Sequence, residues 1–263
     1  METKVQSGPL LGVRIVEFGH FIAAPTASRL LGDLGAEIIK IEPPGGDPIR
    51  GWGEQLDGKS LWWSYHARNK KSVTLNLKAT GARDLALKLV AASDAVIENY
   101  RPGQMEKFGL GPADLAAVVP GIPMVRVSGF GQTGPRAKDP SFGMIGEALG
   151  GIRYLSGYPS DQSDLPPVRI GVSIGDTVAG MYGALGLLAA LVERREAPAG
   201  TPARIVDVAL TESVLTLLEG ILPEYGALGK VRQPAGSRLP AAAPTNAYLC
   251  QDGAFVLIGA NSD

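Results

Sequence analysis

Cysteine and histidine are scarce in this sequence, and neither sign of charge is in clear excess. A single cysteine, Cys250, excludes an intrachain disulfide and a four-cysteine zinc site. Two histidines, His20 and His66, are too few for a typical metal cluster, so we expect no metal. The formal net charge of −1 argues against a general binder of nucleic acid or anionic membranes.

Long apolar runs are also missing. The N-terminal residues METKVQSGPLLG lack the apolar core of a signal peptide. The most apolar segment, residues 181–191, is too short to span a bilayer and is rich in small side chains. We therefore expect a cytoplasmic protein with no nucleic-acid or membrane partner.

Short β-branched runs alternate with helical patterns in the first half of the chain. The predicted strands are residues 13–18, 37–42, 72–77, 95–100 and 124–130. The predicted helices between them are residues 25–34, 81–93 and 114–119. This alternation indicates an α/β fold with a doubly wound, Rossmann-like parallel sheet.

The pattern changes in the second half. The predicted elements there are helices 142–150, 176–195 and 210–228, a strand at 204–208, and a hairpin formed by 247–250 and 254–259. We interpret residues 1–225 as a large domain with a linker helix. Residues 226–263 are then the beginning of a second, smaller domain. Because the chain stops just after the hairpin, we expect it to be a truncated piece of a longer protein.

A literal G-x-G-x-x-G spans residues 129–134 after a predicted strand. A dinucleotide fingerprint requires a helix to begin there, so that its N-terminal amides face the pyrophosphate. Here Pro135 and a polar loop follow instead. The pattern therefore predicts a flexible glycine loop at a strand end, which is a place where active sites are often lined.

Asp176 stands where an apolar stretch meets a long helix of small residues. An aspartate at a helix start commonly acts as an N-cap that accepts backbone N–H groups. The same environment also keeps a carboxylate ionised, and an ionised carboxylate is able to attack an activated carbonyl. The flanking Gly175 and Gly180 lack bulk, so a large group has room to approach.

Other polar residues follow predicted strands, on the side where open α/β sheets bind ligands. His20 lies in the first strand-to-helix loop, where a structural role is the simpler interpretation. Tyr100 and Arg101 follow another strand and are suited to stacking and phosphate binding, or form an ordinary surface loop. The basic run at 68–71, which precedes the predicted strand 72–77, is either a solvated turn or a counter-charge for phosphates. The adjacent residues Trp62 and Trp63 are expected to lie in the hydrophobic core or in an interface.

Taken together, six segments resemble the family III CoA-transferases of the CaiB/BaiF type, which include formyl-CoA transferase and succinyl-CoA-dependent dicarboxylate transferases. The resemblance covers essentially the whole chain, in order. It rests on GVRIVEFGHFIAAP (12–25), LGAEIIKIEPPGGD (34–47), RNKKSVTLNLK (68–78), VIENYRPGQMEKFGLG (96–111), SGFGQTGP (128–135) and IGDTVAGMYGALGLLAAL (174–191).

The resemblance implies that the enzyme moves coenzyme A from an acyl-CoA to a free acid, for example from succinyl-CoA to a dicarboxylate. Asp176 is then the catalytic nucleophile, which forms first a mixed anhydride and then an aspartyl-CoA thioester. The only cofactor is coenzyme A itself, as a thioester, without a metal. The implied coenzyme A contacts are His20, Ile22, Ala23, Leu75, Asn76, Leu77, Lys78, Asn99, Tyr100, Arg101 and Lys107. Family members are interlocked homodimers, so a homodimer is expected for the full-length protein.

The sequence departs from the family pattern at three places. An arginine that some members have after the second strand is Pro43 here, and Arg50 is a substitute for it. A lysine that some members have before the helix at 142 is Pro140, with Lys138 nearby. Arg238 replaces part of a glycine-rich loop, and we expect it to clamp the carboxylate of a diacid.

Two other functions remain open at this point. The related α-methylacyl-CoA racemases use an Asp and a His on the same fold, but residues 134–144 contain no histidine, which disfavours a racemase or epimerase. A truncated chain is also compatible with a non-catalytic CoA-binding or assembly protein.

Overall fold

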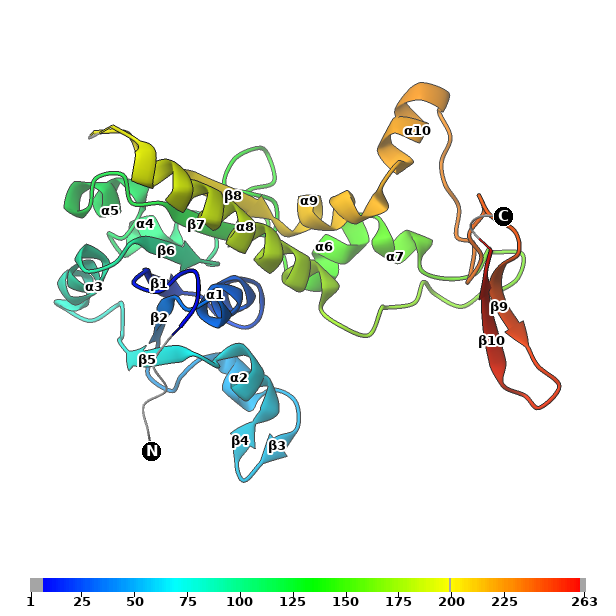
Figure 1. The fold of residues 1–263 in the computed structure, drawn as a ribbon, viewed down its shortest axis with the longest axis horizontal. Helices are drawn as coiled ribbons and strands as arrows, with labels where there is room; N and C mark the ends of the chain where they lie inside the picture. Colours follow the sequence, from blue (N-terminus) through cyan, green and yellow to red (C-terminus); the bar gives the residue numbers. More distant parts are fainter. Residues whose placement is uncertain (1–6, 199, 261–263) are drawn as a thin grey trace.

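The computed structural model describes residues 7–198 and 200–260 (Figure 1). Residues 1–6, 199 and 261–263 lie outside this part of the chain. They include the outer ends of both predicted domains and the first half of the segment METKVQSGPLLG.

The main sheet has six strands, all parallel, in the order β5-β2-β1-β6-β7-β8. Its strands are β1 (Arg14–Phe18), β2 (Glu37–Glu42), β5 (Lys70–Thr74), β6 (Ala95–Glu98), β7 (Met124–Ser128) and β8 (Ile205–Ala209). The strand order reverses between β1 and β6, as in doubly wound nucleotide-binding sheets. The predicted α/β fold with a Rossmann-like parallel sheet is confirmed.

Helices cover both faces of this sheet, because its strands alternate buried side chains between two cores. Ile15 of β1 packs into one core with α1 (Ala23–Asp33) and α8 (Ile174–Glu196). Val16 points into the other core with α3 (Ala82–Ala91), α4 (Gln104–Lys107) and α5 (Pro112–Val118). Figure 1 shows α1 and α8 on one side of the strands and α3 and α5 on the other.

Small residues let α8 approach its neighbours closely. A Cβ added to Gly180 would lie 2.7 Å from the carbonyl oxygen of Ala23, and one added to Gly183 would lie 3.2 Å from a Val125 methyl. By length and composition, Ile174–Glu196 also suffices to cross a membrane, although the predicted apolar segment was too short. Of its most apolar window, 44% is buried inside this fold.

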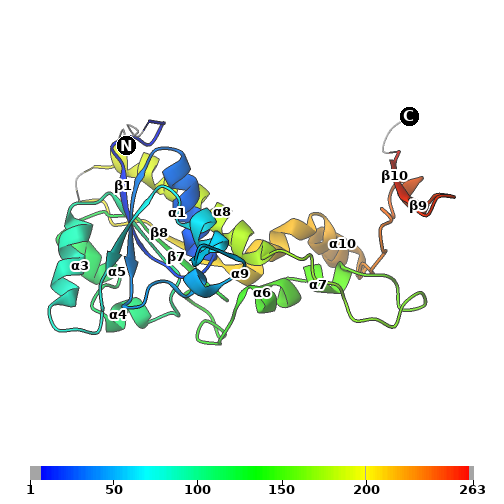
Figure 2. The same cartoon turned by 90° about the horizontal axis from the view of Figure 1, so that it is seen from below.

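The remaining elements extend away from the sheet (Figures 1 and 2). They are α6 (Gly143–Leu149), α7 (Ile152–Leu155), α9 (Leu210–Leu215), the 3-10 turn η2 (Thr216–Leu218), α10 (Ile221–Leu228), β9 (Thr245–Leu249) and β10 (Phe255–Gly259). The antiparallel β9-β10 hairpin confirms the prediction for this region. The single helix predicted over 210–228 is wrong, because Glu219 adopts a positive φ of 52° and Gly220 separates two helices.

Several boundaries also differ from prediction. The strand expected at 72–77 is Lys70–Thr74, and those expected to end at 100 and 130 end at Glu98 and Ser128. A small unit formed by the 3-10 turn η1 (Pro48–Gly51), the β3 (Gln55–Leu56) and β4 (Lys59–Ser60) hairpin and α2 (Leu61–His66) was not predicted. The division into domains 1–225 and 226–263 stays a prediction.

Candidate active site

The predicted binding residues meet at one edge of the sheet. The carboxyl ends of parallel strands share an edge, and in sheets of this topology ligands bind where the strand order reverses. Here that point lies between β1 and β6. His20, Ile22 and Ala23 follow β1, Asn99 to Arg101 follow β6, and residues 75–78 follow β5.

Asn99 locks the loops that follow β1 and β6 together. Its Oδ1 accepts a hydrogen bond from the His20 amide at 2.8 Å, and its Nδ2 donates to the His20 carbonyl oxygen at 2.9 Å. Asn99, a predicted coenzyme A contact, therefore uses both the oxygen and the nitrogen of its carboxamide to hold this loop. The neighbouring Phe21 has a φ of 61°, and its amide donates to Asp47 at 3.1 Å.

A buried ion network beneath this loop was missed from the sequence. Lys40 Nζ contacts Glu17 at 2.6 Å, Asp47 at 2.8 Å and the Gly19 carbonyl oxygen at 2.6 Å. Lys70 Nζ also contacts Glu17, at 2.8 Å. Glu17 is buried, but the two lysines lower its pKa to about 2, so it is ionised. The signal was present, since charged residues inside strands that are otherwise apolar must be paired.

The aromatic residues near the loop pack on each other. The ring of Tyr100 lies edge-on to His20 at 5.0 Å and to Phe108 at 5.9 Å. Burial lowers the pKa of His20 and raises that of Tyr100 to about 12, so both side chains are neutral at pH 7. Tyr100 thus supports the His20 loop, and its stacking on an adenine stays a prediction.

Three of the predicted contacts are exposed cations without an acidic partner among the described residues: Lys78, Arg101 and Lys107. They are available for an anionic ligand. Arg50, expected to replace the missing arginine at Pro43, is already engaged. It forms a bidentate pair with Glu42 at 2.7 and 2.8 Å and stacks on Trp63 at 3.5 Å.

Leu75 and Leu77 are half-buried and pack against the core beneath β5, whereas Asn76 is exposed. The Asn76 side chain accepts a hydrogen bond from the Lys78 amide at 3.1 Å. This short turn fixes the chain after β5 and presents the Lys78 side chain to solvent.

Asp176 lies in the first turn of α8, three residues after the N-cap Ser173, so its interpretation as an N-cap is wrong. Because α8 connects β7 to β8, it begins at the carboxyl edge of the sheet. Burial, reinforced by Glu147, raises the pKa of Asp176 to about 6, while Arg169 opposes the rise. The expected strong stabilisation of its charge by backbone amides is therefore not observed, although most molecules are still ionised at pH 7.

Gly143, the first residue of α6, lies directly against the carboxylate of Asp176. A Cβ added to Gly143 would be 2.9 Å from Asp176 Cγ and closer still to Oδ2. Carbon atoms in contact are normally about 3.5–4.0 Å apart. The absence of a side chain at Gly143 therefore makes the space in which the carboxylate lies.

A cleft of about 390 Å³ runs from the loop after β1 to the start of α8, and Asp176 is not among the residues that line it. It opens between α1, α2 and the first turn of α8. Its walls include Ile22, Thr26, Trp62, His66, Ser173 and Thr177. Ile22 is a predicted contact, and Ser173 and Thr177 stand close to Asp176 in the chain, so the cleft approaches the helix start that carries Asp176. Trp62, expected in the core or an interface, is a wall of this cleft.

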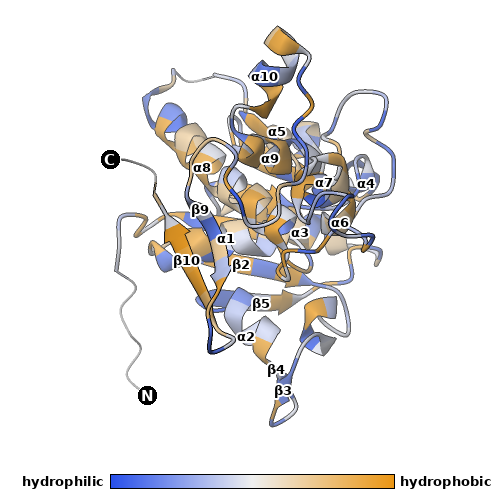
Figure 3. Cartoon of the chain, turned by 90° about the vertical axis from the view of Figure 1, so that its right-hand side faces the viewer, coloured by the Kyte–Doolittle hydropathy of each residue, from blue (hydrophilic) through white to orange (hydrophobic). Residues whose placement is uncertain are grey.

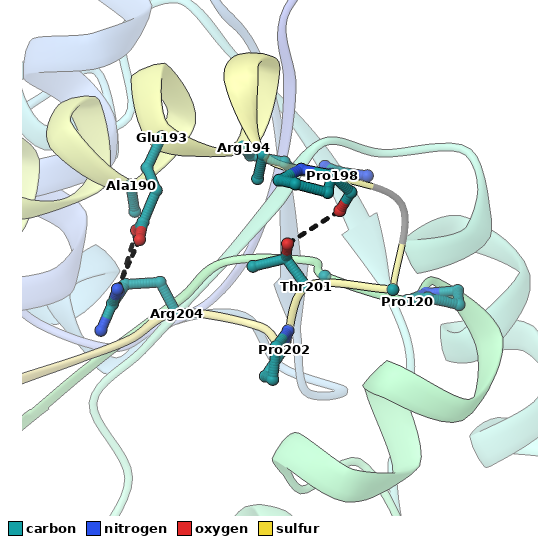
Figure 4. Close-up of a pocket in the computed structure, with 11 residues that line it drawn as sticks. Pro120, Ala190, Glu193, Arg194, Pro198, Thr201, Pro202 and Arg204 are labelled. Atoms are coloured by element: carbon teal, nitrogen blue, oxygen red, sulfur yellow. Dashed lines mark hydrogen bonds and ion pairs between the residues drawn. The ribbon is translucent and has the colours of Figure 1, made fainter.

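Other cavities lie apart from this edge. One of about 160 Å³ is at the C-terminal end of α8, between Glu193, Thr201 and Arg204 (Figure 4), and contains none of the predicted site residues. Another, of about 770 Å³, is lined by residues 219–248, including Arg238. Arg238 donates to the Ala235 carbonyl oxygen, and its role as a clamp stays a prediction.

The glycine loop at 129–134 is followed by no helix until Gly143, so the helix that a dinucleotide fingerprint requires directly after it does not form in this stretch. Its Gln132 amide donates to Asp207 at 2.8 Å. Lys138 is exposed in the same connection. No group of three or more His, Cys, Asp or Glu residues suited to a metal occurs within residues 7–198 and 200–260.

Comparisons with known proteins agree on one family. The model of CoA-transferase family III matches residues 10–263. Succinyl-CoA–D-citramalate CoA-transferase of Chloroflexus aurantiacus is 49% identical over 257 residues, which are 97% of this chain and 62% of that protein. The alpha subunit of succinyl-CoA–L-malate CoA-transferase from the same organism is 41% identical and is covered to 59%.

A solved structure is also similar. A CAIB/BAIF family protein from Brucella suis matches with a TM-score of 0.85 and 32% identity, over 94% of this chain and 65% of that protein. The chain thus spans less than two thirds of the length of these relatives.

Proposed function

This chain belongs to CoA-transferase family III, and we propose that the full-length protein transfers coenzyme A from an acyl-CoA to a free carboxylic acid. The observation that carries the proposal is the position of Asp176. Its carboxylate lies against Gly143, which leaves space next to it, and Ser173 and Thr177 at the same helix start line a cleft that continues to Ile22 and the loop after β1.

The proposed reaction uses Asp176 as a nucleophile. An ionised Asp176 oxygen attacks the acyl carbonyl, the carbon–sulfur bond breaks, and CoA thiolate leaves an aspartyl anhydride. The thiolate then attacks the aspartyl carbonyl, which releases the donor acid and forms an aspartyl-CoA thioester. The acceptor carboxylate repeats these steps in reverse, and the thiolate departs as the new acyl-CoA. No net proton is taken up or released.

The environment of Asp176 supports this role. A carboxylate with a pKa of about 6 is still ionised in most molecules at pH 7 but is less well solvated than a surface carboxylate. The N-terminal turn of α8 presents positive partial charge to negative charge that develops there. Coenzyme A would be bound by Ile22, Ala23 and the loop around His20, with Lys78, Arg101 and Lys107 opposite its phosphates.

The substrates are proposed from the relatives. Those named above are called transferases between succinyl-CoA and D-citramalate or L-malate, which are dicarboxylates. A succinyl-CoA:glutarate CoA-transferase of Homo sapiens is 32% identical. We infer that the acceptor of this enzyme is a dicarboxylic acid and that succinyl-CoA is a suitable donor.

The exposed apolar surface supports a homodimer. Every residue of β10 is exposed, including Phe255 and Leu257, and Figure 3 shows this strand as strongly hydrophobic. Leu222, Tyr225 and Leu228 of α10 are exposed as well. Such surfaces are normally covered. We propose that the rest of the chain and a second copy cover them in an interlocked homodimer, in the cytoplasm and without membrane or nucleic-acid partners.

The test is a transfer assay on the full-length protein with a panel of acyl-CoAs and acids, for the wild type and Asp176→Ala. We expect the wild type to form new acyl-CoA and the variant to lose at least about 10³-fold in rate. Transfer that survives in Asp176→Ala refutes the nucleophile. Deuterium entering the α-carbon from solvent without an acceptor acid would instead indicate a racemase.

A further inference from the structure

A buried carboxylate next to Asp176 has two cationic neighbours but no complete hydrogen bond. Glu147, one turn after Gly143 on α6, is 1% exposed. Its Oε2 lies 3.4 Å from Arg153 Nε and 3.8 Å from Arg169 Nε. Its Oε1 and the Arg153 Nε have no hydrogen-bond partner in the described part of the chain. Buried polar groups are normally satisfied, so this cluster has hydrogen-bonding capacity left for a further group.

The fold places Arg153 and Arg169 close to each other and close to Asp176. Arg153 lies on α7, directly after α6. The chain then makes a long loop and returns, closed by a hydrogen bond of 2.8 Å from the Val168 amide to the Ser156 carbonyl oxygen. Arg169 therefore lies beside α7 and only a few residues before α8. It is near enough to Asp176 to lower its pKa.

The guanidinium groups of Arg153 and Arg169 have N–H donors that make no hydrogen bond within the described residues. Arg169 is 47% exposed, and its one hydrogen bond among the described residues is a weak one, 3.5 Å from Nη2 to Ser173 Oγ. The Arg153 side chain is 23% exposed and donates no hydrogen bond within the same residues. A guanidinium can bind a carboxylate through two parallel hydrogen bonds, and neither arginine uses this capacity on Glu147.

The formal charges of the cluster change during the proposed reaction. Asp176 and Glu147 balance Arg153 and Arg169 while the nucleophile is free. When Asp176 becomes an anhydride or a thioester, its charge disappears and the cluster has a surplus of one positive charge. A second carboxylate on the substrate would restore the balance at that stage.

We propose that Arg169, supported by Arg153, binds the remote carboxylate of an aliphatic dicarboxylic substrate whose other carboxyl group reacts at Asp176. Glu147 is the counter-ion that holds the arginines in place when the site is empty. The inference rests on the proposed function, since it names the substrate group that the same site selects. It makes Arg169 a specificity residue and Glu147 a positioning residue.

The test is an internal competition on the full-length protein. Glutarate and valerate, which have five carbons each, compete at equal concentration for CoA from succinyl-CoA, and the ratio of the two acyl-CoA products is measured. Because both products arise from the same loaded enzyme, any effect of Arg169 on the donor cancels. We expect Arg169→Met to lower the glutaryl-to-valeryl ratio by about 10- to 100-fold. Arg169→Lys, which keeps the charge but not the planar fork, falls between.

Arg204→Met is the matched control. Arg204 is an exposed arginine paired with Glu193 at the opposite end of α8, and its substitution leaves the ratio unchanged. An unchanged ratio in Arg169→Met, or an equal loss of both products, would overturn the inference while the proposed function stands. Failure of the wild type to transfer CoA to any acid would refute the proposed function, and this inference with it.

Discussion

The substitution Gly143→Ala adds one methyl group where the structure leaves room only for the Asp176 carboxylate. The new carbon would lie 2.9 Å from Asp176 Cγ, against a normal separation of about 3.5–4.0 Å. The carboxylate, α6 or both must therefore move by roughly 1 Å. Misplacement of a reacting group by about 1 Å can lower the rate by about 10²-fold. We expect this loss in kcat for CoA transfer by the full-length enzyme.

We expect Gly143→Ala to affect the stability of the fold less than it affects the rate of CoA transfer. Gly143 has no positive φ, and alanine is the better helix former, so part of the steric cost is offset. Thermal unfolding is therefore expected to shift by only a few degrees, while kcat falls. Gly51→Ala is the matched control: Gly51 ends η1 without a positive φ and has nothing within 4 Å of an added Cβ, and kcat should not change.

The assay follows new acyl-CoA by chromatography in single-turnover and steady-state experiments. A Gly143→Ala enzyme within about threefold of the wild type in kcat would refute the argument, because it would mean that the Asp176 carboxylate tolerates displacement. An equal loss in Gly51→Ala would show that the effect is not specific to the site.

Three further predictions follow from the buried charges. Asp176→Asn should raise the free energy of unfolding at pH 7 by about 1–3 kcal/mol, since a carboxyl whose pKa rises from 3.8 to about 6 on folding costs stability when ionised; denaturant titrations should show the gain shrinking as pH falls from 6 towards 4. Glu147→Gln removes a negative neighbour, so the acidic limb of the kcat/KM profile should move to lower pH, and an unmoved limb would contradict the coupling of these two carboxyls. Lys40→Met leaves Glu17 and Asp47 buried without their shared cation and should destabilise the fold by about 3–5 kcal/mol in urea; a change below about 1 kcal/mol would contradict the ion network.

The sheet could be predicted from the sequence because its signal is local. The β-branched runs that became β1, β2 and β6 are short and continuous, and the helices between them have clear spacing. The break at Glu219 could not be predicted, since its positive φ is imposed on a residue that ordinarily favours a helix interior. The unit η1-β3-β4-α2 has no periodicity of its own and is fixed by contacts such as Arg50 with Glu42 and Trp63.

The site was only partly predictable. Motif resemblance located Asp176 and the strand-end loops, and the topology places them at one edge. It did not indicate that Asn99 is used internally, that Lys40 and Glu17 pair beneath the loop, or that Glu147 lies beside Asp176. These relations join residues far apart in the chain, and their effect on pKa depends on burial, which no local pattern contains.

The central claim is that Asp176 becomes covalently attached to coenzyme A. The most direct measurement is mass spectrometry of full-length enzyme that is mixed with an acyl-CoA, without acceptor, then acid-quenched and digested. We predict a peptide containing Asp176 that bears one coenzyme A as a thioester, and its absence from Asp176→Asn. Transfer that proceeds with no adduct, or with the adduct on another residue, would contradict the account.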